Sequence, residues 1–217
     1  MRIKYFLITI IALMMASLGL TAQTKTTMPT RYHEFRPSVI TLSDGRVLRE
    51  NLTNIFLKNS TLLYVSGEVV KEANMDNILK VDFEDRSYVN LNGQLAWLVD
   101  SVGHNMLYEI DLFDQVAYEA NLKNNVNITN IDFSQDVMST ANVDLNNEGD
   151  YMMPVIPHFY YLYEGKLIKA KDRVVQLALP KDRNRQFKTV VGQPNFSWID
   201  PDCLMLLLRF ISTPNNN

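Results

Sequence analysis

The 217-residue sequence predicts an α+β protein that is mainly antiparallel β, with a meander or small barrel of short strands followed by a hairpin and two to three C-terminal helices. Two observations predict this fold class. Between Pro37 and Asn121, short β-prone runs are broken by turn residues about every eight to twelve positions, which is typical of antiparallel sheets. From Val174 onward, apolar residues recur at helical spacing instead.

The clearest turn signal in the β-rich region is Asn92-Gly93, because both residues tolerate the positive φ of a two-residue hairpin loop. A loop of this length pairs Val89 with Ala96 and Tyr88 with Trp97. Aromatic and apolar side chains then face each other across the two strands.

The stretch VITLSDGRVL, residues 39–48, alternates apolar side chains around Asp44-Gly45. We interpret it as a second primed turn, which would pair Leu42 with Val47. Asp44 is then a turn residue, not part of a catalytic site. Further turns are predicted at residues 58–59, 66–67 and 84–85.

The β-rich region ends with two predicted strands, residues 106–113 and 116–122. Residues 122–157 are rich in Asn and Asp and have little periodicity, so we expect a connecting segment with room for one strand. Residues 158–170 predict another hairpin, with its turn at Glu164-Gly165. Its expected cross-strand pairs are Leu162 with Leu167 and Tyr161 with Ile168.

Two helices are predicted after this hairpin. Val174, Leu177 and Ala178 share the face of the first, which ends near Pro180. The second ends at Gly192, a good C-terminal stop. Its apolar face comprises Phe187, Val190 and Val191.

A third, terminal helix begins at Asp200-Pro201, where an N-cap precedes a proline at the first helical position. One stripe of this helix is Leu204, Leu207, Leu208 and Ile211, and the opposite side carries Met205, Leu206 and Phe210. A helix that is apolar all round has to be covered on both sides. We expect this cover to come from the other helices and the hairpin, with a second copy of the chain or an envelope partner as the alternative.

The domain organisation follows from these patterns. Residues 1–22 are a predicted signal peptide and 23–36 an N-terminal linker. Residues 37–121 form the antiparallel β domain, 122–157 the connecting segment, and 158–217 the hairpin with the helical C-terminal region.

The first 22 residues have the layout of a secretory signal: basic Arg2 and Lys4, an apolar run at residues 6–15, and small residues before Gln23. The run is shorter than the roughly 20 residues that a membrane-spanning helix needs. Cleavage removes two basic and no acidic residues, which changes the net charge from −3 to −5. A mildly acidic mature chain has no general electrostatic drive toward nucleic acid.

Two resemblances bear on these expectations. Residues 37–84 are similar to a small Sm-like or SH3-like barrel in Leu42, Asp44 and Gly45, followed by Ile78, Val81 and Phe83. The stretches FEDRSYVNLNGQLAWLVD and YYLYEGKLIKAKDRVVQLALPKDRNRQFKTVVGQPNFSWIDPDCLMLLLRFI resemble exported proteins of unknown function from Bacteroidetes-type Gram-negative bacteria. This second resemblance implies an envelope location, in the periplasm or at the outer-membrane surface, and no catalytic residue.

The residues that could support metal or nucleophilic chemistry are scattered. His33, His104 and His158 lie in separate segments without ligand spacing, so we expect no zinc site and no cofactor. Ser101 lies near His104 but lacks the pattern of a nucleophile turn. Cys203 excludes an intramolecular disulfide because it is the single cysteine; it is expected to be a buried packing residue, the alternative being a thiol activated by the helix N-terminus.

The connecting segment contains a partial calcium-loop pattern. Asp144, Asn146 and Glu148 stand at alternate positions before Gly149. The twelfth position is Val155, where the loop would require a bidentate Glu. We therefore interpret this stretch as a polar linker.

Two charged groups define the alternatives for function. A hydrolase would need carboxylates assembled from separate strands, with Asp82, Glu84, Asp85 and Asp111 as candidates. Residues 166–188 carry eight basic and two acidic residues, which could bind an anionic glycolipid. The candidate anion-binding residues are Lys169, Lys171, Arg173, Arg183, Arg185 and Lys188.

The sequence thus favours an exported cell-envelope protein that acts as a non-catalytic binding or structural module. The alternatives are the strand-assembled hydrolase and the anion-binding module. Expected partners are an envelope protein or an anionic glycolipid, with a homo-oligomer possible through the 201–212 helix and no transmembrane segment after cleavage.

Cleavage after Ala22 is the testable expectation from this layout. Intact-mass measurement of the protein from the envelope fraction should give the mass of residues 23–217, because signal peptidase removes the apolar leader. A mass that still includes residues 1–22 would contradict it.

Overall fold

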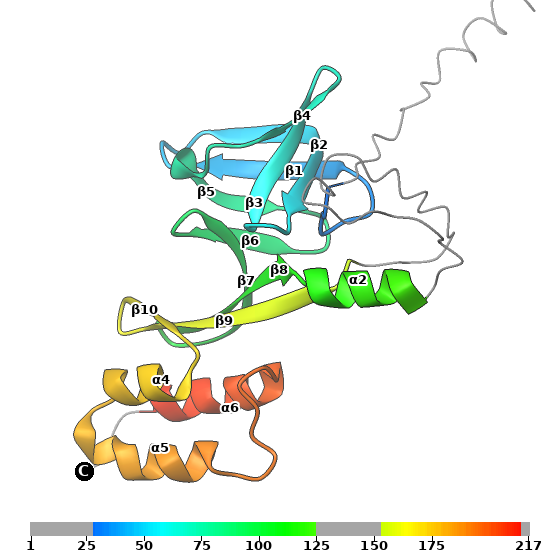
Figure 1. Cartoon of the computed structure of the whole chain (residues 1–217). Helices are drawn as coiled ribbons and strands as arrows, with labels where there is room; N and C mark the ends of the chain where they lie inside the picture. Colours follow the sequence, from blue (N-terminus) through cyan, green and yellow to red (C-terminus); the bar gives the residue numbers. More distant parts are fainter. Residues whose placement is uncertain (1–27, 125–152, 214–217) are drawn as a thin grey trace, which may run out of the picture.

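The computed structural model describes residues 28–124 and 153–213. It confirms the predicted fold class: ten antiparallel strands form one sheet that curls into a half-barrel, and three helices follow at the C-terminus (Figure 1). The strands in chain order are β1 Arg36–Leu42, β2 Val47–Phe56, β3 Thr61–Ser66, β4 Val69–Glu72, β5 Ile78–Asp82, β6 Ser87–Leu91, β7 Gln94–Val102, β8 Asn105–Phe113, β9 Val155–Tyr163 and β10 Lys166–Lys169. The helical elements are η1 Met75–Asn77, α2 Gln115–Asn124, α4 Asp172–Ala178, η2 Lys181–Arg183, α5 Asn184–Val191 and α6 Pro201–Ser212.

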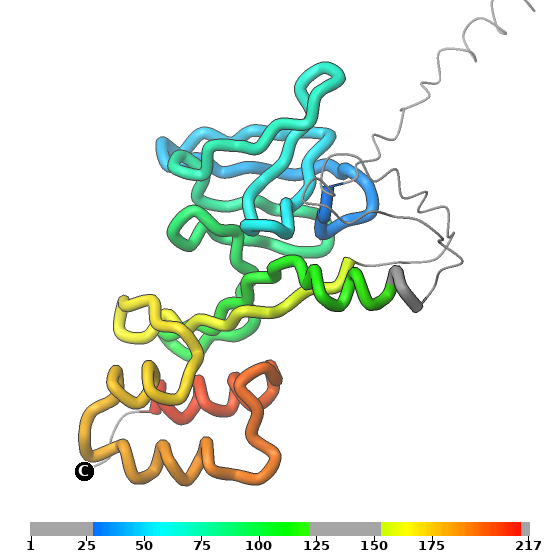
Figure 2. The backbone as a smooth tube through the Cα atoms, viewed as in Figure 1, coloured from blue at the N-terminus to red at the C-terminus, as the bar shows by residue number. Residues whose placement is uncertain are grey.

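The order of strands across the sheet is β10-β9-β8-β7-β6-β5-β1-β2-β3-β4. Chain neighbours are therefore sheet neighbours, except where β1 pairs with β5 and joins two meanders into one sheet. The trace in Figure 2 shows the half-barrel above, β8 and β9 crossing the middle, and the helical layer below.

The two hairpin turns with positive φ at both loop residues have the predicted geometry. Asn92 and Gly93 have φ values of 53° and 89°, and their strands pair Val89 with Ala96 and Tyr88 with Trp97. The loop at Glu164-Gly165 has φ values of 49° and 75°. Its strands pair Leu162 with Leu167 and Tyr161 with Ile168, as predicted.

The prediction for the turn at Asp44-Gly45 is wrong by one residue in register. Val47 pairs with Thr41, not with Leu42. The N–H of Gly45 donates to the Leu42 carbonyl at 3.0 Å, and Gly45 is the only residue of this loop with positive φ, at 85°. The loop therefore has three residues, the hairpin class in which a glycine bulge follows the turn.

The predicted strand at residues 116–122 is a helix, α2. Asp114 explains the difference, because its side chain accepts a 2.9 Å hydrogen bond from the N–H of Ala117 and its carbonyl accepts one from the N–H of Tyr118. An aspartate in this position caps a helix, so β8 ends before it. The Tyr118 ring then packs on Phe113, with ring centroids 5.3 Å apart.

The connecting segment ends earlier than predicted, since β9 already begins at Val155. β9 pairs with β8 along its length, from Phe113–Val155 to Met106–Leu162. The C-terminal hairpin thus extends the same sheet as the rest of the strands.

The terminal helix has the predicted start and the predicted buried stripe. Asp200 accepts a hydrogen bond from the N–H of Asp202 at 3.0 Å, and Pro201 is the first helical residue. The buried residues of α6 are Leu204, Leu207, Leu208 and Ile211. Leu206 on the opposite side is 59 % exposed, so the expected cover of both sides within the chain is incomplete.

The predicted faces hold for α5 and fail for α4. Phe187 of α5 is buried, and the helix ends at Gly192 as expected. In α4 the buried residue is Val175, followed by Leu179, while Val174 and Leu177 are exposed. Five of the six residues from 174 to 179 are apolar, so periodicity alone did not define which way the helix is rotated.

Two cores lie along the sheet. The first fills the half-barrel and comprises the buried residues Ile40, Ile55, Leu62, Met75, Ile78, Val81, Phe83, Tyr88 and Leu95. The second lies between the sheet and the C-terminal helices and comprises Leu107, Phe159, Tyr161, Tyr163, Ala170, Val175, Leu179, Phe187, Leu204, Leu207, Leu208 and Ile211. A smaller cluster contains Ala96, Tyr108 and Ile110.

Hydrogen bonds from the β2–β3 loop connect it to β7 and β8. Ser60, in the β2–β3 loop, accepts a hydrogen bond from the N–H of Leu95 through its carbonyl at 2.6 Å and donates one to the Leu95 carbonyl through its hydroxyl at 2.8 Å. The N–H of Phe113 donates to the Leu57 carbonyl at 2.8 Å.

Among the described residues, the structure contains no helix long and apolar enough to cross a membrane.

The positive φ of Gly93 makes its replacement a test of the turn. Gly93→Val should destabilise the fold by about 1 kcal/mol or more, because a β-branched residue resists this backbone conformation. Thermal and denaturant unfolding measure the loss. Asn92→Gly is the control, since glycine accepts the same φ; equal melting temperatures for wild type and Gly93→Val would refute the turn assignment.

Candidate functional site

The four carboxylates proposed for a hydrolase are engaged separately. Asp82 forms an ion pair with Lys80 at 2.7 Å and accepts a hydrogen bond from Ser87. Glu84 is exposed. Asp85 and Asp111 contact different residues of the segment that precedes β1.

That N-terminal segment, residues 29–36, leads into β1 and lies beside the end of β2. The N–H of Arg31 donates to the Ile55 carbonyl at 3.0 Å, and the Arg31 guanidinium forms a 2.7 Å ion pair with Asp111 on β8. Both side chains of this pair are about 90 % buried, with 12 % and 11 % exposed. The neighbouring Tyr32 hydroxyl donates to Asp85 at 3.1 Å. The carboxylates therefore anchor this segment to β8 and to the β5–β6 turn.

Glu109 is the residue that the sequence analysis missed. It lies two positions before Asp111 on β8, so both side chains project from the same face of the sheet. Its cross-strand neighbours are Trp97 on β7 and Phe159 on β9, which places a carboxyl group among aromatic rings. The available signal was the alternation itself: Leu107, Glu109 and Asp111 share one face of an apolar strand.

The surroundings of Glu109 favour its protonated form. Burial, followed by the negative charge of Asp111, raises the pKa of Glu109 to about 7, and the charges of Arg86 and Arg31 oppose this shift without cancelling it. The Asp111 Oδ1 atom is buried and has no hydrogen-bond partner among the described residues. A hydrogen bond between the two carboxyl groups also raises the pKa of Glu109. Such a bond requires a proton on one of the two groups, because two ionised carboxylates cannot hydrogen-bond to each other.

This acidic pair is built into the joint between the half-barrel and the rest of the sheet. Arg86 covers the neighbouring aromatic face, with its guanidinium carbon 4.2 Å from the Trp97 ring centroid. Arg31 forms the ion pair with Asp111. The chemistry available here is proton binding at Glu109, next to the ion pair that anchors residues 29–36.

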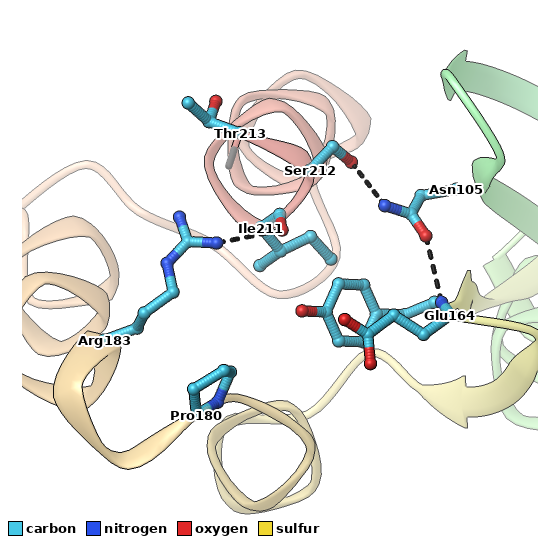
Figure 3. A pocket seen from close by; sticks show the side chains of 8 residues that line it. Asn105, Glu164, Pro180, Arg183, Ile211, Ser212 and Thr213 are labelled. Carbon is cyan, nitrogen blue, oxygen red and sulfur yellow. Dashed lines mark hydrogen bonds between the residues drawn. The ribbon is translucent and has the colours of Figure 1, made fainter. Parts of the chain in front are cut away.

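The second polar site is a pocket of about 200 Å³ where the sheet meets the end of α6 (Figure 3). Its lining residues are Asn105, Tyr163, Glu164, Pro180, Arg183, Ile211, Ser212 and Thr213. Asn105 donates to the Ser212 hydroxyl at 3.1 Å and accepts from the Glu164 N–H at 3.0 Å. The amide side chain thus connects the start of β8, the β9–β10 turn and the end of α6.

Arg183 forms the opposite wall of the pocket and is 7 % exposed. Its guanidinium donates to the Ile211 carbonyl at 3.0 Å and to the Phe210 carbonyl, and its carbon lies 4.5 Å from the Phe210 ring centroid. These carbonyls are at the C-terminus of α6, where a positive charge also complements the helix dipole. Arg183 therefore belongs to the interior of the helical layer and not to a basic surface.

The other candidate anion-binding residues lie nearer to solvent. Lys169 is half-buried, with its ammonium 5.8 Å from the Tyr160 ring centroid. Lys171, Arg173, Arg185 and Lys188 are exposed. So are Lys166 and Lys181, which belong to the same basic region.

The histidines do not converge. His33 and His104 are exposed, and Ser101, close to His104 in sequence, is exposed as well. Burial and the charges of Lys169 and Lys171 lower the pKa of His158. No group of three or more His, Cys, Asp or Glu residues that could hold a metal ion occurs within residues 28–124 and 153–213. The calcium-loop residues Asp144, Asn146 and Glu148 lie outside the described residues.

Cys203 is half-buried in the first turn of α6, and its thiol is not activated. The sulfur lies 3.2 Å from the Asp200 carboxylate and 3.4 Å from the Asn195 carbonyl. A backbone hydrogen bond from Ser197 favours the thiolate, but desolvation and the carboxylates of Asp200 and Asp202 outweigh it and raise the pKa of the thiol.

Comparison of the chain with protein-family models, with curated proteins and with solved structures gives no match. The site therefore has to be interpreted from its own geometry.

The raised pKa of Glu109 predicts a pH dependence of stability. Between about pH 4.5, the ordinary value, and about pH 7, the folded protein holds a proton that the unfolded chain has released. The free energy of unfolding should therefore fall across this window as the pH rises, because above it the folded state carries a half-buried second negative charge beside Asp111. Denaturant unfolding at a series of pH values measures this.

Glu109→Gln is the informative variant for this dependence. Its amide can donate to Asp111 at any pH, so the fall between about pH 4.5 and 7 should be smaller than in the wild type. Glu68→Gln, in the exposed β3–β4 turn, is the matched control and should keep the wild-type profile. Identical profiles for the wild type and Glu109→Gln would disprove the assignment.

Proposed function

We propose that this protein is exported to the envelope of a Gram-negative bacterium, where it is a non-catalytic interaction module that contacts an anionic envelope component through residues 166–188. The observation that carries the proposal is the exposure of this basic region. The exposed side chains are Lys166, Lys171, Arg173, Lys181, Arg185 and Lys188. They belong to β10 and to the helices that follow it.

The charge distribution supports an anionic partner. Residues 166–188 have a net charge of +6, while the whole chain is at −3 and the chain without residues 1–22 at −5. A locally basic surface on an acidic protein attracts anions to one end of the molecule only. A phosphorylated glycolipid of the envelope has the required charge.

The fates of the other charged groups support a non-catalytic role. Asp82, Asp85 and Asp111 each have a separate basic or hydroxyl partner. Asp111 pairs with Arg31 of the N-terminal segment, and Glu109 interacts with Asp111. The arrangement stabilises the fold, whereas a strand-assembled hydrolase would need these carboxylates to face a common substrate.

The location rests on the signal-peptide layout of residues 1–22 and on the resemblance to exported Bacteroidetes-type proteins. The Sm-like or SH3-like resemblance of residues 37–84 concerns fold alone and assigns no ligand. The exposed Leu206 on α6 leaves one apolar side chain for a second copy or an envelope protein, so self-association is a subsidiary proposal.

Charge reversal on the basic region tests the function. The processed protein should bind a heparin column, a soluble polyanion, and elute with salt. The triple variant Arg173→Glu, Arg185→Glu and Lys188→Glu should bind at least about tenfold more weakly, because each contact of this kind contributes on the order of 1 kcal/mol near an anionic surface.

The control has the same change in net charge on the half-barrel. Arg49→Glu, Lys58→Glu and Lys71→Glu replace exposed basic residues of β2, the β2–β3 loop and β4. This triple variant should bind nearly as the wild type does. Equal losses in both triple variants would show that residues 166–188 have no special role.

A further inference from the structure

The outward side of α4 combines basic and apolar side chains. Leu177 is 77 % exposed and Val174 is 38 % exposed. Lys171 precedes the helix and Arg173 lies in its first turn, both exposed. We call residues 171–181 the α4 patch.

Helix geometry places the exposed residues together. Arg173 and Leu177 are four positions apart, so they lie one above the other on the same side of α4. Val174 is three positions from Leu177 and flanks the same side. The inward side carries Val175 and Leu179, which belong to the core under the sheet.

The α4 patch is short and carries a net positive charge. It ends at Lys181, the exposed first residue of η2, one position after Pro180. Asp172 is its one acidic residue, against three basic ones. Exposed leucines occur singly on many proteins and mean little by themselves. Here the 77 % exposed Leu177 lies one helical turn after the exposed Arg173, and exposed Lys171 and Lys181 stand at the two ends of the patch, which is a more specific arrangement.

A water-exposed surface of this composition matches one kind of partner. Anionic bilayers attract basic residues at the headgroup level and accept apolar side chains just below it. A soluble anion would use the charges of the α4 patch and leave Leu177 in water. A membrane leaflet contacts both the basic side chains and Leu177.

We propose that the α4 patch docks on an anionic membrane surface, with Lys171, Arg173 and Lys181 contacting lipid phosphates and Leu177 entering the boundary between headgroups and acyl chains. This inference rests on the proposed function and specifies its partner: the anionic component is the bilayer surface itself. An anionic bilayer complements the positive charge of the patch and accepts its exposed apolar side chains, Val174 and Leu177. The contact is peripheral, made by one face of a seven-residue helix.

Vesicle binding tests the proposal. The processed protein is mixed with vesicles of phosphatidylcholine and phosphatidylglycerol at 3:1, and with vesicles of phosphatidylcholine alone. We expect sedimentation with the anionic vesicles only. Leu177→Gln should lower the partition coefficient about tenfold, because it removes the one leucine side chain that becomes buried in the bilayer on binding. Arg173→Ala should lower it about fivefold.

Leu206→Gln is the matched control. It makes the same chemical change at the 59 % exposed leucine of α6, outside the α4 patch, and should leave vesicle binding unchanged. Both leucines are exposed, so neither change should lower the melting temperature appreciably. The heparin column gives the second readout: Leu177→Gln should elute at the wild-type salt concentration.

The remaining outcomes each overturn the proposal in a distinct way. If Leu177→Gln binds anionic vesicles as strongly as the wild type does, Leu177 does not enter the bilayer. The proposed anion-binding function would then still stand. If the protein is retained on heparin but does not bind vesicles, the membrane is excluded as the partner and the proposed anion-binding function stands. If the protein binds neither heparin nor anionic vesicles, the proposed function is overturned as well. A dimer in analytical ultracentrifugation that Leu177→Gln dissociates would identify a second copy of the chain as the occupant.

Discussion

The pairing of β8 with β9 is the constraint on which the rest of the structure depends. It joins strands separated by more than forty residues of sequence, over eight consecutive pairs from Met106–Leu162 to Phe113–Val155. β8 belongs to the half-barrel meander, and β9 leads into the C-terminal helices. Without this pairing the helical layer would have no sheet to cover.

The side chains of β9 show how the pairing creates the second core. Phe159, Tyr161 and Tyr163 alternate along the strand and point toward the helices. Tyr161 is fully buried, and its hydroxyl donates to the Leu204 carbonyl at 2.9 Å. Burial raises its pKa, so the phenol stays a neutral donor. One strand therefore supplies both the apolar contact and the polar connection to α6.

Charged residues divide into those that hold the fold and those that face solvent. Arg31 and Asp111 fix the N-terminal segment, and Arg183 satisfies the last carbonyls of α6. A hydrogen bond to a charged group contributes roughly 1.5 to 3 kcal/mol, and leaving a buried carbonyl without a donor costs a comparable amount. Lys171 and Arg173 have no such role in the interior, which is why the proposed function is assigned to residues of this kind.

The sequence by itself determined what depends on near neighbours along the chain. Asn92-Gly93 and Glu164-Gly165 produced the predicted pairs because a two-residue loop defines the register of its own strands. The N-cap at Asp200 and the buried stripe of α6 were predictable for the same reason. Only the tertiary structure decided the insertion of β1 beside β5, the pairing of β9 with β8 and the orientation of α4. It also decided the site: burial by residues far away in sequence raises the pKa of Glu109 and places Arg183 in the interior. Desolvation by distant residues has no local sequence signal. This is the physical reason why the turns and caps were predictable from the sequence and the site was not.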